Sequence, residues 1–173
     1  MKTSPENHYK YCPRCATKGI FNNNELSFKC NSCGFHFFLN AAAAVTALIF
    51  NPQGELLLAR RGIEPHYGKL DLPGGFIDPG ENAETAILRE IKEELDVIPD
   101  SISYYGSFAN EYHFSGTIVN TVDSVFRCQL SNFENIKYLD DIMGIEFIQP
   151  KKINIDDLPF KSLQNIIKQI QNE

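Results

Sequence analysis

Apolar and polar residues alternate along the chain in patterns that predict several β-strands. The unbroken apolar run at 41–50 and the run ELLLARR at 55–61 predict two strands, joined as a hairpin across the turn NPQG. Alternation over 101–130 predicts two or three antiparallel strands, and residues 142–150 predict another. We therefore expect a mixed sheet.

Two segments change to helical spacing. Residues 82–95 predict a helix with Asn82 as its N-cap, entered through a loop rich in glycine and proline. The C-terminal residues 159–171 predict an amphipathic helix, since their apolar residues recur at helical spacing: Leu163, Ile166, Ile167 and Ile170. Helices packed on a mixed sheet place the chain in the α/β class.

Composition narrows the class of protein. The chain has 173 residues, 43% hydrophobic and 22% charged, which suits one main soluble domain with a small appendage. The net charge of −6 argues against a protein that binds nucleic acid through its overall charge. The longest apolar run, 41–50, is shorter than the ~18–20 residues of a membrane span, and no secretory signal precedes it. We expect a cytoplasmic protein with no membrane partner.

Four of the five cysteines form two Cys-x2-Cys pairs, fourteen residues apart: Cys12, Cys15, Cys30 and Cys33. Zn²⁺ favours four thiolates in a tetrahedron, and two such pairs fit a short hairpin. The spacing predicts a zinc ribbon over residues 1–38 with one structural Zn ion, while an iron–sulfur cluster or free thiols stay open. We expect His36 to be a packing residue rather than a ligand. Cys128 stands in a strand-like run and is expected to be a small core residue.

The segment around these cysteines is locally basic. Its cations are Lys10, Arg14, Lys18 and Lys29. Four positive charges are only weak evidence for a nucleic-acid-binding surface. Binding of nucleic acid through the ribbon is therefore possible but not favoured.

Three glutamates in REIKEEL, Glu90, Glu93 and Glu94, fall within an arc of roughly 100° of the predicted helix. Like charges at i,i+4 are unfavourable, and a hard cation such as Mg²⁺ relieves them because it binds carboxylate oxygens. The adjoining arc is apolar and is expected to pack on the sheet, through Ile87, Leu88, Ile91 and Leu95. A solvated charged face is the simpler alternative.

The longer stretch GFIDPGENAETAILREIKEELDV, residues 75–97, resembles the Nudix box, the signature of the Nudix hydrolase family. LPG precedes it, as in the family, and one position departs, because Asp96 stands where the pattern has glycine. Glycine serves a left-handed turn at a helix end, and Asp tolerates that conformation better than most residues. The resemblance covers about residues 40–150. It implies a Nudix α/β/α sandwich with a mixed sheet over residues 39–173, preceded by the zinc ribbon.

The resemblance also implies an activity and its residues. Typical members hydrolyse a nucleoside diphosphate linked to a moiety X, with two or three Mg²⁺ or Mn²⁺ ions. By position the metal ligands would be Glu90, Glu93, Glu94 and the carbonyl of Gly74, with Glu81 and Arg89 as a supporting pair. Either Glu93 or Glu90 would be the general base, with Glu111 and Asp123 as weaker candidates.

A zinc ribbon before a Nudix domain resembles the arrangement of bacterial NADH pyrophosphatases, whose relatives often form homodimers. Their SQPWPFP-type motif is replaced here by YYGSFANEYHFSG, and no proline occurs between Pro99 and Pro150, so the substrate stays open among dinucleotides, ADP-ribose and nucleotide sugars. Weaker candidates for substrate contacts are His66, Tyr67, Arg60, Arg61 and Tyr112. Two alternatives remain: a nucleotide or RNA sensor without activity, and an enzyme that processes RNA 5′ ends.

Overall fold

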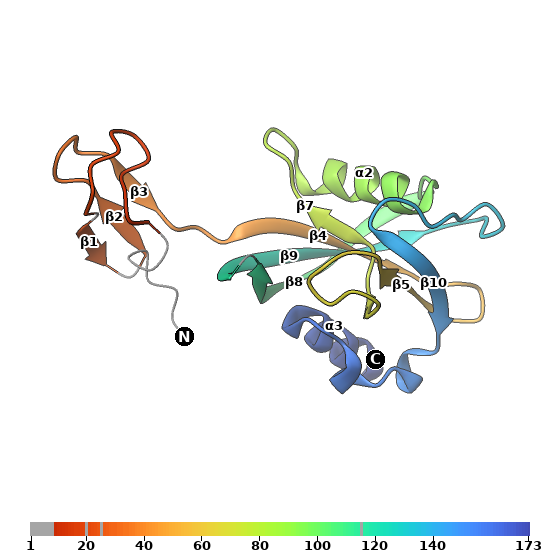
Figure 1. The fold of residues 1–173 in the computed structure, drawn as a ribbon. Helices are drawn as coiled ribbons and strands as arrows, with labels where there is room; N and C mark the ends of the chain where they lie inside the picture. The colour runs from red at the N-terminus through yellow and green to blue at the C-terminus, as the bar shows by residue number, and fades with distance from the viewer. Residues whose placement is uncertain (1–8, 20, 25, 115) are drawn as a thin grey trace.

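The computed structural model describes residues 9–173 except 20, 25 and 115. Figure 1 shows a small sheet at one end of the molecule and, after an extended segment, a larger body in which strands lie between two helices. The mixed α/β architecture expected from the sequence is confirmed.

The small sheet has the strand order β1-β2-β3, with antiparallel neighbours: β1 (Phe21–Asn24), β2 (Ser27–Lys29) and β3 (His36–Phe38). Its core centres on Phe28, which is fully buried beneath the rings of Tyr9, Phe35 and Phe37 at centroid distances of 5.2–6.2 Å. His36 is exposed and its ring lies against Phe38. One buried ring makes only a small hydrophobic core, and segments of this size usually need further stabilisation, such as a bound metal ion, in order to fold.

The larger body contains two sheets. The four-stranded sheet has the order β7-β4-β9-β8: β7 (Gly74–Phe76), β4 (Ala42–Ile49), β9 (Thr117–Gln129) and β8 (Ser101–Phe114). The three-stranded sheet has the order β10-β5-β6: β10 (Ile142–Ile148), β5 (Leu56–Arg61) and β6 (Leu70–Asp71). Strands β4 and β9 run parallel, whereas the other neighbours are antiparallel, so the first sheet is mixed.

The predicted hairpin of 41–50 with 55–61 is wrong. Strand β4 pairs with β7 and β9, and β5 pairs with β6 and β10. Across the turn, the isolated bridge Phe50↔Leu56 is what the described residues retain of the expected pairing. Both edges of β4 are occupied by segments distant in sequence, so long-range pairing outweighs closeness along the chain.

Two helices cover the body from opposite sides, α2 (Ala83–Leu95) and α3 (Lys161–Gln171), and two short 3₁₀ turns precede α3: η1 (Pro150–Lys152) and η2 (Ile155–Asp157) (Figure 1). The prediction for the C-terminal helix is confirmed, since Leu163, Ile166, Ile167 and Ile170 are all buried. Within the described residues, no helix has the length and apolarity needed to cross a membrane.

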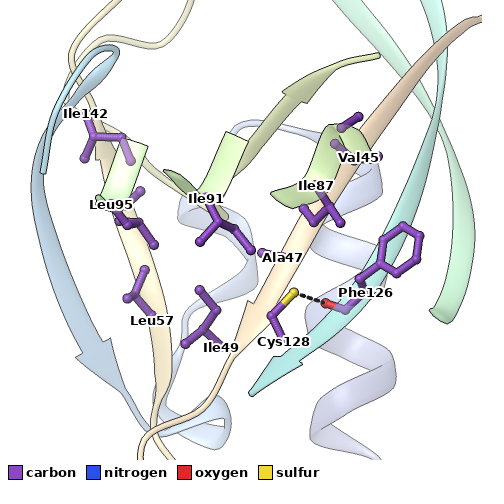
Figure 2. Close-up of a cluster of buried hydrophobic side chains, with 12 residues drawn as sticks. Val45, Ala47, Ile49, Leu57, Ile87, Ile91, Leu95, Phe126, Cys128 and Ile142 are labelled. Atoms are coloured by element: carbon purple, nitrogen blue, oxygen red, sulfur yellow. Dashed lines mark hydrogen bonds between the residues drawn. The ribbon is translucent and has the colours of Figure 1, made fainter. Parts of the chain in front are cut away.

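The core beneath α2 is shown in Figure 2. Ile87, Ile91 and Leu95 are each fully buried and point at β4 and its neighbours. Cys128 is buried in the same cluster with its thiol on the Phe126 carbonyl, as expected for a core residue, and burial raises its pKa to about 12.

The expectation that Leu88 joins this core is wrong. Its side chain is 37% exposed, and Ala86 is buried in its place. At about 100° per residue, Leu88 lies about 100° beyond Ile87, at the edge of the packed face. The buried arc is therefore centred between Ile87 and Glu94, closer to the glutamates than the apolar pattern suggested.

Both ends of α2 follow the sequence prediction. The Asn82 side chain accepts the Thr85 N–H at 2.8 Å, and Asp96 adopts the left-handed conformation with φ 55°. The Asp96 carboxylate pairs with Lys137 at 2.7 Å and also with Lys92, and these cations lower its pKa to about 2. Local ion pairs thus hold a non-glycine residue in a conformation that usually favours glycine.

The packing of α2 gives a stability test. We expect Ile91→Ala to lower the free energy of unfolding by about 2–5 kcal/mol, because it leaves a cavity in the core. Leu88→Ala should lower it by less than about 1 kcal/mol, because the side chain is already partly exposed. Urea unfolding of both variants checks this, and equal losses would contradict the assignment of the buried face.

Candidate functional site

A cavity of about 400 Å³ opens where α2, the two sheets and the start of α3 meet. Its polar lining includes the box residues Gly74, Gly75, Arg89, Glu90, Glu93 and Glu94. Further polar lining residues come from strands and loops distant in sequence, among them Arg61, Asp71, Asn110, Thr121, Asp123, Asp140 and Asp141. The fold thus gathers carboxylates, two arginines and several aromatic rings around one space.

Glu94 is the most buried glutamate of the box, with 8% of its surface exposed. Its Oε2 accepts the backbone N–H of Gly74 at 3.0 Å. Burial, reinforced by the nearby charges of Glu90 and Asp71, raises the pKa of Glu94 to about 9. Gly74 has φ 143°, and a Cβ there would overlap the carbonyl oxygen of Val45. A glycine is therefore needed for this backbone to pack so closely against β4, the position from which its N–H reaches Glu94.

Arg89 joins the loop to the helix. It forms two hydrogen bonds of 2.9 Å to the carboxylate of Glu81 and a third, of 3.0 Å, to the carbonyl of Phe76. Glu81 also accepts the Asp78 N–H at 3.1 Å, and hydrogen bonding from Arg89 lowers its pKa. Bidentate contacts of this kind are directional, so the loop is fixed against the first turns of α2.

The same guanidinium also holds two of the three glutamates among the candidate metal ligands. Its Nη1 donates to Glu90 at 2.8 Å and to Glu93 at 2.9 Å. Burial raises the pKa of Glu90, whereas Glu93 is half exposed. Gly75 leaves room for Glu90, since a Cβ at Gly75 would lie 2.5 Å from its Oε1. Among the described residues, the glutamate oxygens do not converge as closely as metal ligands do.

The candidate substrate residues divide between two places. Tyr112 lines the cavity of the box, with its ring 5.9 Å from Phe76 and 5.6 Å from Phe160. Arg60 and Tyr67 line a different cavity, of about 510 Å³.

Of the other candidates for substrate or base, Arg61 and Asp123 line the cavity, whereas His66 and Glu111 are outside its lining. The His66 ring meets Phe160 edge-on at 5.2 Å, beside the cavity. Arg61 lines the cavity, with its guanidinium 5.1 Å from the Phe160 ring and 2.8 Å from Asp71. Of the weaker candidates for the base, Asp123 is buried in the lining, whereas Glu111 is exposed and outside it.

Sequence reasoning missed Asn110 and Phe160. Asn110 lies in the middle of a long strand, and Phe160 precedes the C-terminal helix. Neither belongs to a motif, and only the pairing of distant strands and the docking of α3 bring them to the cavity. An asparagine inside an otherwise apolar strand face was the available signal.

The four paired cysteines converge in the small sheet. Their sulfurs lie within 4.8 Å of one another, with 3.7 Å between Cys12 and Cys33 and the same between Cys15 and Cys30. Each Cys-x2-Cys pair closes in the same way, because the residue after the second cysteine has positive φ and donates its N–H to the carbonyl of the first cysteine. Hydrogen bonding from Thr17 lowers the pKa of Cys15 to about 6, which favours its thiolate.

The fold and the box define the class of protein, and comparison with known proteins agrees. The NUDIX domain profile matches residues 40–168, and the chain belongs to that family. A NUDIX hydrolase structure from Nitrosomonas europaea superposes with a TM-score of 0.70, covering 95% of this chain and 92% of that one at 20% identity, which shows the fold.

Two curated relatives are similar in sequence. A NAD-capped RNA hydrolase NudC from Pseudomonas aeruginosa is 30% identical over 102 residues, which are 58% of this chain and 35% of that protein. An ADP-ribose pyrophosphatase from Methanocaldococcus jannaschii is 38% identical over 76 residues, 44% of each chain. The matched segment thus spans about a third to less than half of the length of these relatives.

The raised pKa of Glu94 predicts how stability depends on pH in magnesium-free buffer. The folded state holds a proton on Glu94 that the unfolded state releases, so stability should fall as pH rises from about 4.5 to about 9. Glu94→Gln carries no titrating group and should show a smaller loss. Thermal unfolding of both proteins across this range measures the difference. Parallel curves would show that Glu94 ionises freely in the folded protein.

Proposed function

We propose that the protein is a pyrophosphohydrolase that cleaves a nucleoside diphosphate linked to a moiety X, releasing a nucleoside monophosphate and X-phosphate. One observation carries the proposal: the buried carboxylate of Glu94 lines the same cavity as Glu90, Glu93 and three aromatic rings. Carboxylates suit the cation-assisted chemistry of a diphosphate, and aromatic rings suit a base.

The residues fit a divalent cation. Glu94 is a buried carboxylate whose pKa is raised by burial and by neighbouring carboxylates, and carboxylate oxygens are the ligands that Mg²⁺ and Mn²⁺ accept. Glu90, Glu93, Glu94 and the carbonyl of Gly74 would hold two or three such ions. When bound, the ions neutralise phosphate charge and lower the pKa of water. Arg89 engages one oxygen of Glu90 and one oxygen of Glu93, so the other oxygen of each carboxylate would be available to a cation.

The chain's own groups then have distinct tasks. Arg89 and Glu81 keep the loop at a fixed distance from α2, so that Gly74 and Glu94 stay opposed. Glu93, half exposed, and Glu90, with its raised pKa, are the two candidates to accept the proton of the attacking water. Arg61 brings a positive charge to the cavity wall, where a phosphate oxygen would be bound.

The relatives support an adenine-containing substrate. The names of the two curated relatives refer to ADP-ribose and to a NAD cap, and both molecules contain an adenosine diphosphate unit. The ring of Tyr112 contacts those of Phe76 and Phe160, and a purine would stack on this aromatic surface.

For the N-terminal segment we propose a zinc ribbon over residues 1–38, followed by the hydrolase domain over 39–173. Sulfurs about 2.3 Å from a tetrahedral centre lie about 3.8 Å apart. The measured separations of 3.7 Å support this geometry. Four cysteines fill all four positions, so the ion would be structural.

A substrate panel with Mg²⁺ or Mn²⁺ tests the activity: NADH, NAD, ADP-ribose, diadenosine polyphosphates and nucleotide sugars. We expect hydrolysis of an adenosine diphosphate derivative, with at least about a hundredfold loss of kcat in Glu94→Gln, because the variant removes a buried anionic ligand. The matched control is Glu84→Gln, an exposed position on the same helix, which should keep full activity.

Product analysis by mass spectrometry identifies X-phosphate and the mononucleotide. Absence of turnover with every compound, together with retained nucleotide binding, would overturn the enzyme proposal in favour of a sensor. Equal loss in both glutamine variants would point to a general effect on α2.

Metal analysis tests the ribbon. Purified protein should hold about one zinc ion per chain, and Cys30→Ser should lose it, because three thiolates and a hydroxyl bind Zn²⁺ more weakly. Cys128→Ala, which alters a core cysteine remote from the four, should retain the ion. Elemental analysis by mass spectrometry measures this, and iron in place of zinc would contradict the assignment.

A further inference from the structure

A buried side-chain amide, that of Asn110, lines the wall of the cavity. Asn110 is 8% exposed, and its buried Oδ1 accepts no hydrogen bond within the part of the chain that the structure describes. A buried polar group without a partner destabilises the folded state. Its presence at a cavity wall is therefore best explained by a partner that enters the cavity.

The strand register explains why Asn110 lacks a protein partner. The residue directly opposite Asn110 on β9 is Thr121, whose side chain carries a hydroxyl. That hydroxyl donates instead to Asp123 Oδ1 at 2.8 Å. The Thr121 hydroxyl is thus directed along β9, and the Oδ1 of Asn110, a residue of the cavity wall, does not receive its hydrogen bond.

Asp123 gives the same wall a second polar group. It is two residues from Thr121 on the same face of β9, which makes it the diagonal neighbour of Asn110 across the strands. It is 8% exposed and lines the cavity, and no ion pair formed by the described residues includes it. An ionised carboxylate accepts several hydrogen bonds, so Asp123 retains acceptor capacity beyond the bond from Thr121.

The aromatic surface adjoins these two groups. Tyr112 is two residues from Asn110 on the same face of β8, and its ring contacts those of Phe76 and Phe160. A flat ring stacked on this surface would present its edge to the amide and the carboxylate. The wall offers one group that both donates and accepts and one that only accepts.

We propose that Asn110 and Asp123 recognise the exocyclic amino group of an aminopurine base, which makes them specificity-determining residues of the cavity. The proposal rests on the proposed function, since it names the base of the nucleotide substrate. An asparagine amide pairs with an amino N–H and the adjacent ring nitrogen of adenine, and a carboxylate accepts N–H donors of guanine or adenine. A purine with an oxo group in place of the amino group would turn a lone pair toward Asp123 and lose this pairing.

Equilibrium binding of AMP, GMP and IMP tests the recognition without turnover. The three share a phosphate and ribose, and IMP lacks the amino group of each of the others. In the full-length protein with Mg²⁺, we expect AMP or GMP to bind at least about tenfold more tightly than IMP. The reason is that the edge of the preferred base matches the hydrogen-bonding groups of the wall, whereas the edge of IMP does not. The tighter of the two identifies the base as adenine or guanine.

Variants assign the selectivity to the two residues. Asn110→Leu, similar in shape, and Asp123→Asn should each reduce the ratio of IMP to aminopurine dissociation constants to about one. The matched control Ala109→Leu, which puts leucine on the exposed face of the same strand, should keep the wild-type ratio. Thermal unfolding gives a second readout: Asn110→Leu should be at least as stable as wild type, because it removes an unpaired amide.

Three results would overturn the proposal: equal binding of the three nucleotides to wild type, failure of all three to bind, or a selectivity that survives both variants. A lower melting temperature for Asn110→Leu would also overturn it, since it would show that the amide has a structural partner. Selective AMP or GMP binding without hydrolysis of any panel compound would instead refute the proposed activity and leave the recognition site intact.

Discussion

The guanidinium of Arg89 holds together parts of the molecule that would otherwise separate. It binds Glu81 and the carbonyl of Phe76 in the loop, and Glu90 and Glu93 on its own helix. Without a cation at this point, three carboxylates would face one another at the border of an apolar core. The same arrangement keeps the loop close enough for Gly74 to reach Glu94, so the shape of the cavity depends on one side chain.

Few positively charged side chains line this cavity, and each of them is already paired with a carboxylate. Seven carboxylates line it, against the two guanidinium groups of Arg61 and Arg89. Each arginine is already engaged, Arg61 with Asp71 and Arg89 with the box glutamates. Burial raises the pKa of Glu94 and Glu90, and the neighbouring carboxylates add to the rise. This surplus of negative charge suits a cavity whose proposed occupant would be bound together with divalent cations.

Local features of the sequence were sufficient to predict α2, its Asn82 cap, the left-handed residue at 96 and the convergence of four cysteines. These depend on contacts between residues near in sequence. The hairpin of 41–50 with 55–61 failed because strand pairing was decided by β9, a distant segment. The assignment of Leu88 failed because a single helix does not reveal where its packed face is centred. For the cavity wall the limit is the same: Asn110 reaches it through the β8–β9 register and the docking of α3, neither of which has a local signature.

Asp96 has an effect beyond ending a helix. The carbonyls of Glu94 and Leu95, at the C-terminal end of α2, accept the N–H groups of Leu139 and Lys137. The side chain of Asp96 pairs with Lys137 as well. The segment that carries Asp140 and Asp141 to the cavity is therefore bound to the end of the glutamate helix as well as to the end of β5, where the Gly62 N–H donates to the Asp141 carbonyl. Helix α2 and the segment with Asp140 and Asp141 are thus linked by hydrogen bonds. A shift of α2 along its axis would therefore also displace that segment at the cavity.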